Sequence, residues 1–223
     1  MPDSTATPLP LQAQEETSHK GSGNPPFGHA LLFTGHMIDR PDREHPRFPA
    51  SAESRVREAM REAIERIPWT TPGTTIGLAG GASGGDILFH EICAELAIPA
   101  RIMLALPAEE FEAASVAPAG PAWIERFRAL LQREGPEGIR IMGEHDGLSE
   151  GLTSNVWQRA NLWMMDAAIA LAREQALLAL WDGHIGDGPG GTEHFIEVAQ
   201  RLGIRILPTL VMRSLLPAQQ SQK

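Results

Sequence analysis

Residues 74–88 read Thr-Thr-Ile-Gly-Leu-Ala-Gly-Gly-Ala-Ser-Gly-Gly-Asp-Ile-Leu, an apolar run that passes through a glycine-rich loop into a helical pattern over 87–98. The apolar part predicts a buried strand. Glycine lets the main chain approach a ligand where a Cβ would collide, and the N-terminus of the following helix presents N–H donors to an anion. The stretch therefore predicts a strand–loop–helix unit that binds phosphate, although glycines of this kind also occur in ordinary turns.

Strands and helices alternate on both sides of this unit. Apolar runs predict strands at 29–33, 74–79, 100–106, 139–143, 175–181 and 204–212. Amphipathic or long apolar segments predict helices at 51–67, 87–98, 121–133, 155–173 and 192–202, with a shorter helix-prone insert at 108–116. Such alternation implies β-α-β crossovers. We therefore predict an α/β fold, a Rossmann-like three-layer domain with a mainly parallel sheet of about six strands and helices on both faces.

Composition divides the chain into three parts. Residues 1–26 are rich in Pro, Ser, Thr, Gln and Gly and nearly lack bulky apolar side chains, so they are expected to form a flexible leader. Residues 27–213 show no break in composition and are predicted to form a single domain. Residues 214–223 are expected to be a flexible tail.

Charge and composition exclude several classes of function. The formal net charge of −9 over 223 residues argues against general nucleic-acid binding and against binding to acidic membranes. Cys93 is the single cysteine, which excludes an internal disulfide and a cysteine-rich zinc site. The eight histidines have no metal-ligand spacing with carboxylates, so we predict no metal site and no required cofactor. Without a long apolar run or a signal sequence, the protein is expected to be cytoplasmic, with no membrane partner.

A second glycine-rich loop follows the predicted strand at 175–181. It ends in Gly190-Gly191-Thr192, where a helix is predicted to begin. Its main-chain N–H groups and the Thr192 hydroxyl can bind phosphate, or the hydroxyl can simply cap the helix. Ligands of parallel sheets bind at the carboxyl ends of the strands. We therefore expect both loops, together with Asp182, to contact the same phosphate-bearing ligand.

The loop after the first predicted strand is the third candidate. Gly35 and His36 end that strand, and Arg40 and Arg43 follow in the loop. Arginine binds phosphate oxygens bidentately, so both arginines are candidate phosphate ligands. The alternative is that they pair with the acidic residues of their own loop. His36 is expected either to contact a base or ribose, or to bond the main chain.

Polar residues also open two of the predicted helices. Asn155, Arg159 and Asn161 lie on the first turns of a helix that then becomes apolar, which indicates a site at its start. Asp86 can accept a hydrogen bond from a ribose hydroxyl, but capping the helix that starts near Ile87 is equally compatible with its position.

These motifs resemble those of a known superfamily. Gly-Gly-Ala-Ser-Gly-Gly-Asp at 80–86 and Gly-Pro-Gly-Gly-Thr at 188–192 are similar to motifs of the SLOG superfamily. Phe33-Thr34-Gly35-His36 and the run at 159–164 add to the match, which spans most of 29–212. This superfamily of Rossmann-like nucleotide-binding proteins includes the lonely-guy phosphoribohydrolases, bacterial DNA-processing proteins, and sensor domains of defence and signalling systems.

The resemblance implies a domain that senses a nucleotide or nucleotide-derived ligand in bacterial signalling or defence. It also implies a homo-oligomer, expected to be a dimer, and an effector or signalling domain as a further partner. The residues expected to contact the ligand are Gly35, His36, Arg40, Arg43, Gly80, Gly81, Ala82, Ser83, Gly84, Gly85, Asp86, Asn155, Arg159, Asn161, Asp182, Gly190, Gly191 and Thr192.

The chain departs from the enzymatic branch of this superfamily. Phosphoribohydrolases carry Pro-Gly-Gly-x-Gly-Thr-x-x-Glu, whereas here one glycine step is missing and Phe195 stands where the glutamate would fall. The alternative function is therefore cleavage of the N-glycosidic bond of a nucleoside 5'-monophosphate, with Glu193 and Arg159 as its catalytic candidates. A role as a DNA-processing accessory is a third reading, which the negative charge disfavours.

Overall fold

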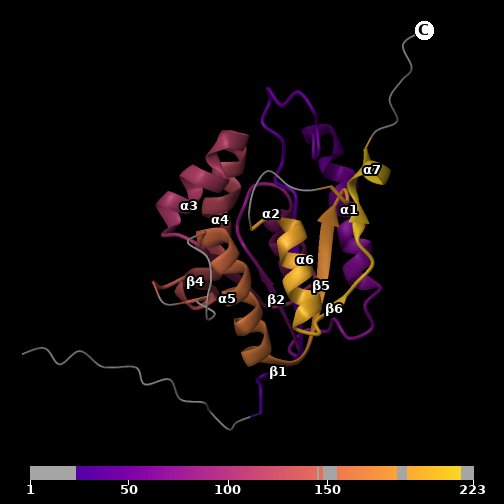
Figure 1. The fold of residues 1–223 in the computed structure, drawn as a ribbon, viewed down its shortest axis with the longest axis vertical. Helices are drawn as coiled ribbons and strands as arrows, with labels where there is room; N and C mark the ends of the chain where they lie inside the picture. Colours follow the sequence, from indigo (N-terminus) through magenta and orange to yellow (C-terminus); the bar gives the residue numbers. More distant parts are fainter. Residues whose placement is uncertain (1–23, 145, 148–154, 185–189, 217–223) are drawn as a thin grey trace, which may run out of the picture.

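The sheet is the centre of the fold. The computed structural model describes residues 24–144, 146–147, 155–184 and 190–216. Seven strands form one sheet in the order β4-β3-β2-β1-β5-β6, and β7 also pairs with β5 (Figure 1). All six strand pairs are parallel. The strands are β1 (Phe27–Gly35), β2 (Thr75–Ala79), β3 (Ala100–Leu104), β4 (Ile139–Ile141), β5 (Ala172–Trp181), β6 (Arg205–Ile206) and β7 (Leu210–Val211).

Helices cover both faces of the sheet. The α-helices are α1 (Glu53–Glu65), α2 (Gly85–Glu95), α3 (Ala108–Ser115), α4 (Pro121–Gly138), α5 (Val156–Leu171), α6 (Thr192–Arg201) and α7 (Met212–Leu215), with 3-10 turns η1 (Ala50–Ala52) and η2 (Ala117–Ala119). Side chains of α1, α2 and α4 share one buried cluster, and those of α5 and α6 share the other. The structure therefore confirms the Rossmann-like three-layer α/β fold.

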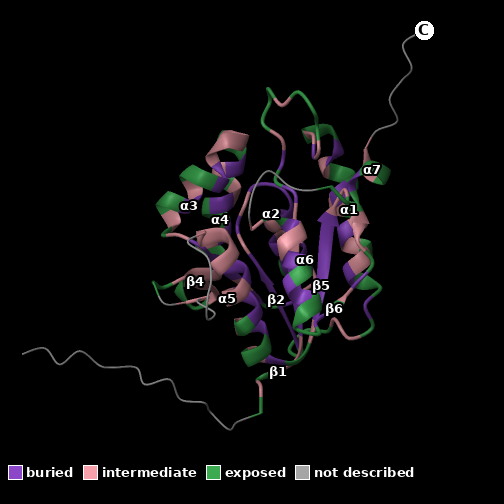
Figure 2. Ribbon diagram, in the orientation of Figure 1, coloured by how far each residue is buried: buried purple, intermediate pink, exposed green. Residues whose placement is uncertain are grey.

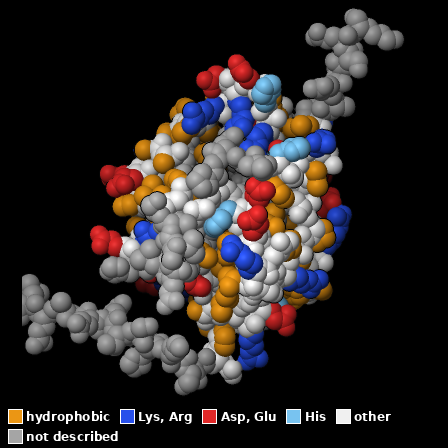
Figure 3. Space-filling model, in the orientation of Figure 1, with side chains coloured by type: hydrophobic (Ala, Val, Ile, Leu, Met, Phe, Trp, Pro, Cys, Tyr) orange, Lys and Arg blue, Asp and Glu red, His pale blue; other side chains and the backbone are white. Residues whose placement is uncertain are grey.

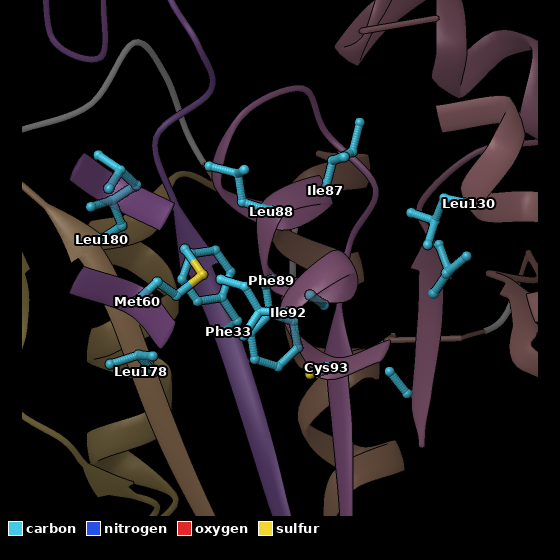
Figure 4. Close-up of a cluster of buried hydrophobic side chains, with 14 of the residues drawn as sticks. Phe33, Met60, Ile87, Leu88, Phe89, Ile92, Cys93, Leu130, Leu178 and Leu180 are labelled. Carbon is cyan, nitrogen blue, oxygen red and sulfur yellow. The ribbon is translucent and has the colours of Figure 1, made fainter. Parts of the chain in front are cut away.

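The apolar pattern of the central strands follows from this arrangement. In β1, Leu31 and Phe33 face the cluster under α1 and α2, whereas Ala30 and Leu32 face the cluster under α5 and α6. Because both faces of the strand are covered, its buried part, residues 30–33, is apolar without interruption. Figure 2 shows the strands buried between helices whose outer faces are exposed. In Figure 4, Phe33 lies among the side chains of α1 and α2, and its ring stacks on Phe89 at 5.1 Å between centroids.

The last predicted strand is wrong in its extent. Instead of one strand over 204–212, two short strands, β6 and β7, pair with successive parts of β5. Pro208 lies between them, and a residue without an N–H cannot donate to the ladder. Helix α7 then enters the segment expected to be a tail, and its Met212 is buried. Residues 1–23 and 217–223, most of the expected leader and tail, lie outside the described residues.

The order of the strands determines where a crevice forms. From β1 the chain adds β2, β3 and β4 on one side, then crosses to β5 on the other side of β1. A parallel sheet opens for ligands at the carboxyl ends of the strands where this reversal occurs. Here that position is the end of β1 and β5, directly before His36 and Asp182. In the described part of the chain, no helix combines the length and apolarity needed to span a membrane.

Candidate functional site

A cleft of about 450 Å³ lies at this edge of the sheet. Its walls come from the ends of β1, β2, β3 and β5, the loops that follow β1 and β2, helix α3, and the N-terminal turns of α2, α5 and α6. Its volume falls within the range of ligand pockets for small molecules. The predicted ligand residues that line it are Gly35, His36, Arg40, Arg43, Gly80, Ala82, Asp86, Asn161, Gly190, Gly191 and Thr192.

The first glycine-rich loop is largely closed by contacts within the protein. The N–H of Ala82 donates to the Asp86 carboxyl group at 3.2 Å, and the N–H of Ser83 donates to the Ser115 carbonyl at 3.0 Å. The N–H of Gly85 donates to the carbonyl of His36 at 3.1 Å. These three amides are therefore not open to an anion. The remaining glycines pack tightly: a Cβ on Gly81 would lie 2.8 Å from the Phe127 ring.

Asp86 occupies the place in this loop where an anion would bind. Its Oδ2 atom lies so close to Gly80 that a Cβ there would stand 2.6 Å away. The side chain is enclosed by the cleft walls, yet part of it faces the cleft. Burial raises the pKa of Asp86 to about 7, and the hydrogen bond from Ala82 only partly opposes this shift. The loop thus offers the cleft a protonatable carboxyl group.

His90 lies one turn further along α2 and is completely buried. Its Nε2 atom donates to the carbonyl of Gly80 at 2.8 Å, and Nδ1 has no hydrogen-bond partner. Burial lowers the pKa of His90 to about 4. The neutral imidazole therefore holds the first glycine-rich loop through the Gly80 carbonyl.

Replacing His90 with glutamine is expected to reduce the sensitivity of the fold to acid. With a folded pKa near 4, His90 stays neutral while the unfolded chain takes up a proton below about pH 6.5, so stability is lost as the pH falls. Through this residue the wild type is expected to lose about 2 kcal/mol between pH 6.5 and 5. Urea unfolding at both pH values measures this loss of stability. His45→Gln, at an exposed histidine, is the control, and equal pH slopes for wild type and His90→Gln would contradict the prediction.

His36 and Asp182 meet where β1 and β5 end. The Nε2 atom of His36 lies 3.4 Å from Oδ1 of Asp182 but makes no hydrogen bond, and the residue is only 8% exposed. Burial, followed by the positive charge of Arg47, lowers the pKa of His36 to about 4. Burial acts to raise the pKa of Asp182, but the His184 N–H, His36 and Arg47 outweigh it and leave that pKa lowered. A neutral histidine therefore lines the cleft here, and the ionised carboxylate of Asp182 lies directly behind it.

The loop after β1 folds around Asp39. Its Oδ2 atom accepts hydrogen bonds from the N–H groups of Arg47 and Phe48, both at 2.8 Å. Arg43 forms an ion pair with Oδ1 of Asp39 at 3.4 Å, and Arg47 forms one with Asp182 at 3.3 Å. The pairing of arginines with nearby acidic residues, left open by the sequence, thus occurs for Arg43.

Positive charge nevertheless borders the cleft. Arg40, Arg43 and Arg47 all line it, and Arg40 is exposed at its rim. Figure 3 shows charged and histidine side chains gathered at the end of the molecule where the loop after β1 lies in Figure 1. This arginine-rich rim brings three guanidinium groups to the cleft of an acidic protein, two of them beside acidic partners.

The second glycine-rich loop is attached to α5. The carbonyl of Gly190 accepts a hydrogen bond from Asn161 Nδ2 at 2.9 Å, and the same amide nitrogen lies 3.1 Å from Nδ1 of His194. Gly191 precedes α6, and among the described residues no side chain caps this helix end. The first N–H groups of α6 have no partner within the helix. Residues 185–189, including Gly188 and Pro189 of the motif, lie outside the described residues.

Several predicted site residues have other contacts. The Asn155 side chain caps α5 by accepting from the N–H groups of Trp157 and Gln158. The Arg159 guanidinium donates to the main-chain carbonyls of Gly143, Glu144 and Asp146 and does not line the cleft. Glu193 does not line the cleft either. Neither Glu193 nor Arg159, the pair expected of a hydrolase, therefore lines the cleft.

The sequence reasoning missed the apolar part of the site. Met103, Phe111, Trp157 and Met164 line the cleft, and the Phe111 and Trp157 rings meet edge to face with centroids 6.0 Å apart. Large apolar residues on helices usually pack in the core, so their type alone carried no signal. Arg47 was detectable, since it belongs to the same arginine-rich loop as Arg40 and Arg43.

The fold and the cleft define a Rossmann-like α/β protein with a small-molecule pocket at the carboxyl edge of its sheet. Among the described residues, no group of three metal-ligating side chains could hold a metal ion. The chain matches no protein-family model and no curated protein sequence. A solved structure similar to it is DNA processing protein A (DprA) from Streptococcus pneumoniae, with a TM-score of 0.37 and 11% sequence identity. The match covers 82% of this chain and 59% of that chain. The function proposed below therefore rests on the cleft.

Proposed function

We propose that this protein binds a nucleotide or nucleotide-derived ligand in the cleft and acts as a sensor domain. The phosphate end of the ligand would lie at the N-terminus of α6, near Gly191 and Thr192. The observation that carries the proposal is the convergence of this uncapped helix end with the arginine-rich rim over one pocket. A helix N-terminus and guanidinium groups are both ready binding sites for phosphate.

Two further observations support this arrangement. The buried Nε2 atom of His36 has no hydrogen-bond partner among the described residues, so a ligand group could pair with it. The first glycine-rich loop has three of its amides engaged and carries the Asp86 carboxyl group, so it supports binding of the uncharged part of a ligand instead of the phosphate. The phosphate is therefore expected to bind at the second glycine-rich loop alone, and not at both loops.

The sensing role is part of the same proposal. A SLOG-like domain in bacterial signalling or defence would couple ligand binding to a homodimer or to an effector domain. Neither Glu193 nor Arg159 lines the cleft, and Arg159 donates to a main-chain carbonyl, which favours binding over cleavage of the N-glycosidic bond.

The direct test is a panel of nucleotides, including monophosphates, cyclic nucleotides and NAD-derived species, scored by the shift in melting temperature. The same mixtures are analysed for free base. A ligand that stabilises the protein without turnover supports the proposal. Release of base that is lost in Glu193→Ala would favour the hydrolase instead, and the absence of any shift across the panel would overturn the binding proposal.

Gly190→Ala is expected to weaken binding of the best panel member by at least tenfold, which corresponds to about 1.4 kcal/mol. Gly190 has a φ of +91°, and a Cβ there would lie 2.6 Å from Trp157 Cβ and 2.8 Å from the N atom of Gln158, so the loop must leave α5. Gly183→Ala is the matched control, because Gly183 has a φ of +83° and nothing within 4 Å. Calorimetry measures the ligand affinity of both variants. Equal losses of affinity would argue against a binding role for the second glycine-rich loop.

A further inference from the structure

The cleft has two chemically different ends. The strand order places Met103 and Ala105 of the β3 end on one side, and His36 and Trp181 on the other. Three strand spacings, about 14 Å, separate β3 from β5. The arginine-rich rim belongs to the loop after β1, whereas the lining residues contributed by β3 and α3, among them Met103 and Phe111, carry no charge. A ligand that spans the cleft would therefore place a charged group at one end and an apolar ring at the other.

Asp86 is the carboxyl group at the apolar end. Gly80 leaves the space for it, since any side chain there would collide with Oδ2. The other carboxylate that lines the cleft, Asp39, is held by main-chain N–H groups within the loop after β1. Asp86 uses one lone pair of Oδ2 for the Ala82 N–H, and no other bond to its side chain is made by the described residues.

The residues that α3, α5, α6 and β3 contribute to the cleft wall carry no charge. From α3 the cleft wall is Phe111, Ala114 and Ser115, from α5 it is Trp157, Ala160, Asn161 and Met164, from α6 it is Thr192 and Phe195, and from β3 it is Met103 and Ala105. His90, on the same helix as Asp86, is turned to the Gly80 carbonyl. The remaining titratable and charged groups of the cleft are His36, Asp39, Arg40, Arg43 and Arg47, all on the loop after β1.

We propose that Asp86 determines specificity in this cleft, because its carboxyl group recognises the heterocyclic ring of the ligand and selects a ring edge that pairs an acceptor with a donor. This inference rests on the proposed nucleotide binding. A protonated carboxyl group offers one O–H donor and one carbonyl acceptor, the same pattern with which an Asn or Gln amide reads adenine bidentately. The second lone pair of Oδ2 remains for the ring amino group.

The proton state of Asp86 then sets the preference between bases. Because burial raises the pKa of Asp86 to about 7, the carboxyl group is mainly protonated at pH 6 and mainly ionised at pH 8. The ionised form only accepts hydrogen bonds, so it matches an edge with two donors, as guanine presents. Adenine is therefore favoured below neutral pH and guanine above it.

The test is calorimetric titration of the full chain with adenosine 5'-monophosphate, guanosine 5'-monophosphate and ribose 5-phosphate at pH 6 and pH 8. The ratio of the two nucleotide affinities is the measured quantity, because their shared phosphate, which titrates at about pH 6, cancels in it. In the wild type, the ratio is expected to shift toward guanosine 5'-monophosphate by roughly tenfold or more from pH 6 to pH 8.

Asp86→Asn is the matched variant. Asparagine fills the same volume, keeps an acceptor for the Ala82 N–H and does not titrate, so its ratio is expected to favour the adenine nucleotide equally at both pH values. Ribose 5-phosphate lacks the nucleobase, and its affinity is expected to be unchanged by the substitution.

Each outcome separates the two proposals. If the nucleotides bind and the wild-type ratio does not change with pH, or if Asp86→Asn keeps the wild-type shift, the role of Asp86 is overturned while nucleotide binding stands. If none of the three compounds binds and the wider panel also fails, nucleotide binding itself is overturned, and the role of Asp86 with it.

Discussion

Replacing Gly84 with alanine is expected to lower the free energy of unfolding by at least about 3 kcal/mol. Gly84 has φ +100° and ψ −121°, a conformation that residues with a Cβ rarely adopt. A Cβ there would also lie 2.4 Å from the N atom of Ile38 and 2.9 Å from the carbonyl carbon of Met37. These are main-chain atoms, which cannot rotate away as a side chain could.

The collision would separate the two loops that form one wall of the cleft. Gly84 and Met37 form an isolated β-bridge, flanked by hydrogen bonds from Ile38 to Ser83 and from Gly85 to His36. Gly73→Ala is the control, because Gly73 also has a positive φ (+81°) but nothing within 4 Å. We expect it to cost about 1 kcal/mol. Urea denaturation of both variants measures the difference, and similar losses would show that the bridge contributes little.

Asp86→Asn is expected to stabilise the protein by up to about 4 kcal/mol at pH 8 and to have almost no effect at pH 4. The ordinary pKa of this carboxyl group is 3.8, and burial raises it to about 7 in the folded state. Below pH 3.8 it is protonated in both states and costs nothing. Between pH 3.8 and 7 the unfolded chain ionises freely while the folded chain does not, so stability falls as the pH rises, and the full cost remains above pH 7.

Asparagine removes this cost because it is neutral at every pH. Denaturation curves at pH 4, 6 and 8 measure the pH dependence of the gain. Asp42→Asn is the control, at an exposed aspartate of the loop after β1, and is expected to have no comparable effect. A gain of the same size at pH 4 and pH 8 would show that packing, and not ionisation, distinguishes the two side chains.

A carboxyl group whose burial destabilises the folded state by this amount is typical of functional sites. The stabilised Asp86→Asn variant is also the one expected to lose the pH-dependent preference between bases. Stability and specificity are thus expected to oppose one another at this position, and the two measurements on one variant are independent.

The elements of the fold were predictable because their signals are local. The uninterrupted apolar run of β5 and the alternation of strands with amphipathic helices require only neighbouring residues, and both recur in the structure. The split of the last strand at Pro208 was also a local signal, but the apolar residues on both sides concealed it. The position of the cleft followed from a general property, since parallel strands all end at the same edge.

Which groups of the cleft are open to a ligand was harder to predict from the sequence. The glycines at 80–85 match the composition of a phosphate loop, yet the N–H groups of Ala82, Ser83 and Gly85 are used by Asp86, Ser115 and His36. Whether an amide is open depends on partners far along the chain. For the same reason, no local pattern indicates that Arg159 donates to the carbonyls of Gly143, Glu144 and Asp146.

The sequence by itself determined the α/β class, the parallel sheet and the edge at which a ligand would bind, because these depend on short-range patterns and on the common direction of the strands. Only the tertiary structure decided that the N-terminus of α6 opens on the cleft, which arginines already have acidic partners, and that Asp86 is half-buried in the cleft wall. These properties depend on distance and desolvation between segments that are remote in the chain, and no local pattern records them.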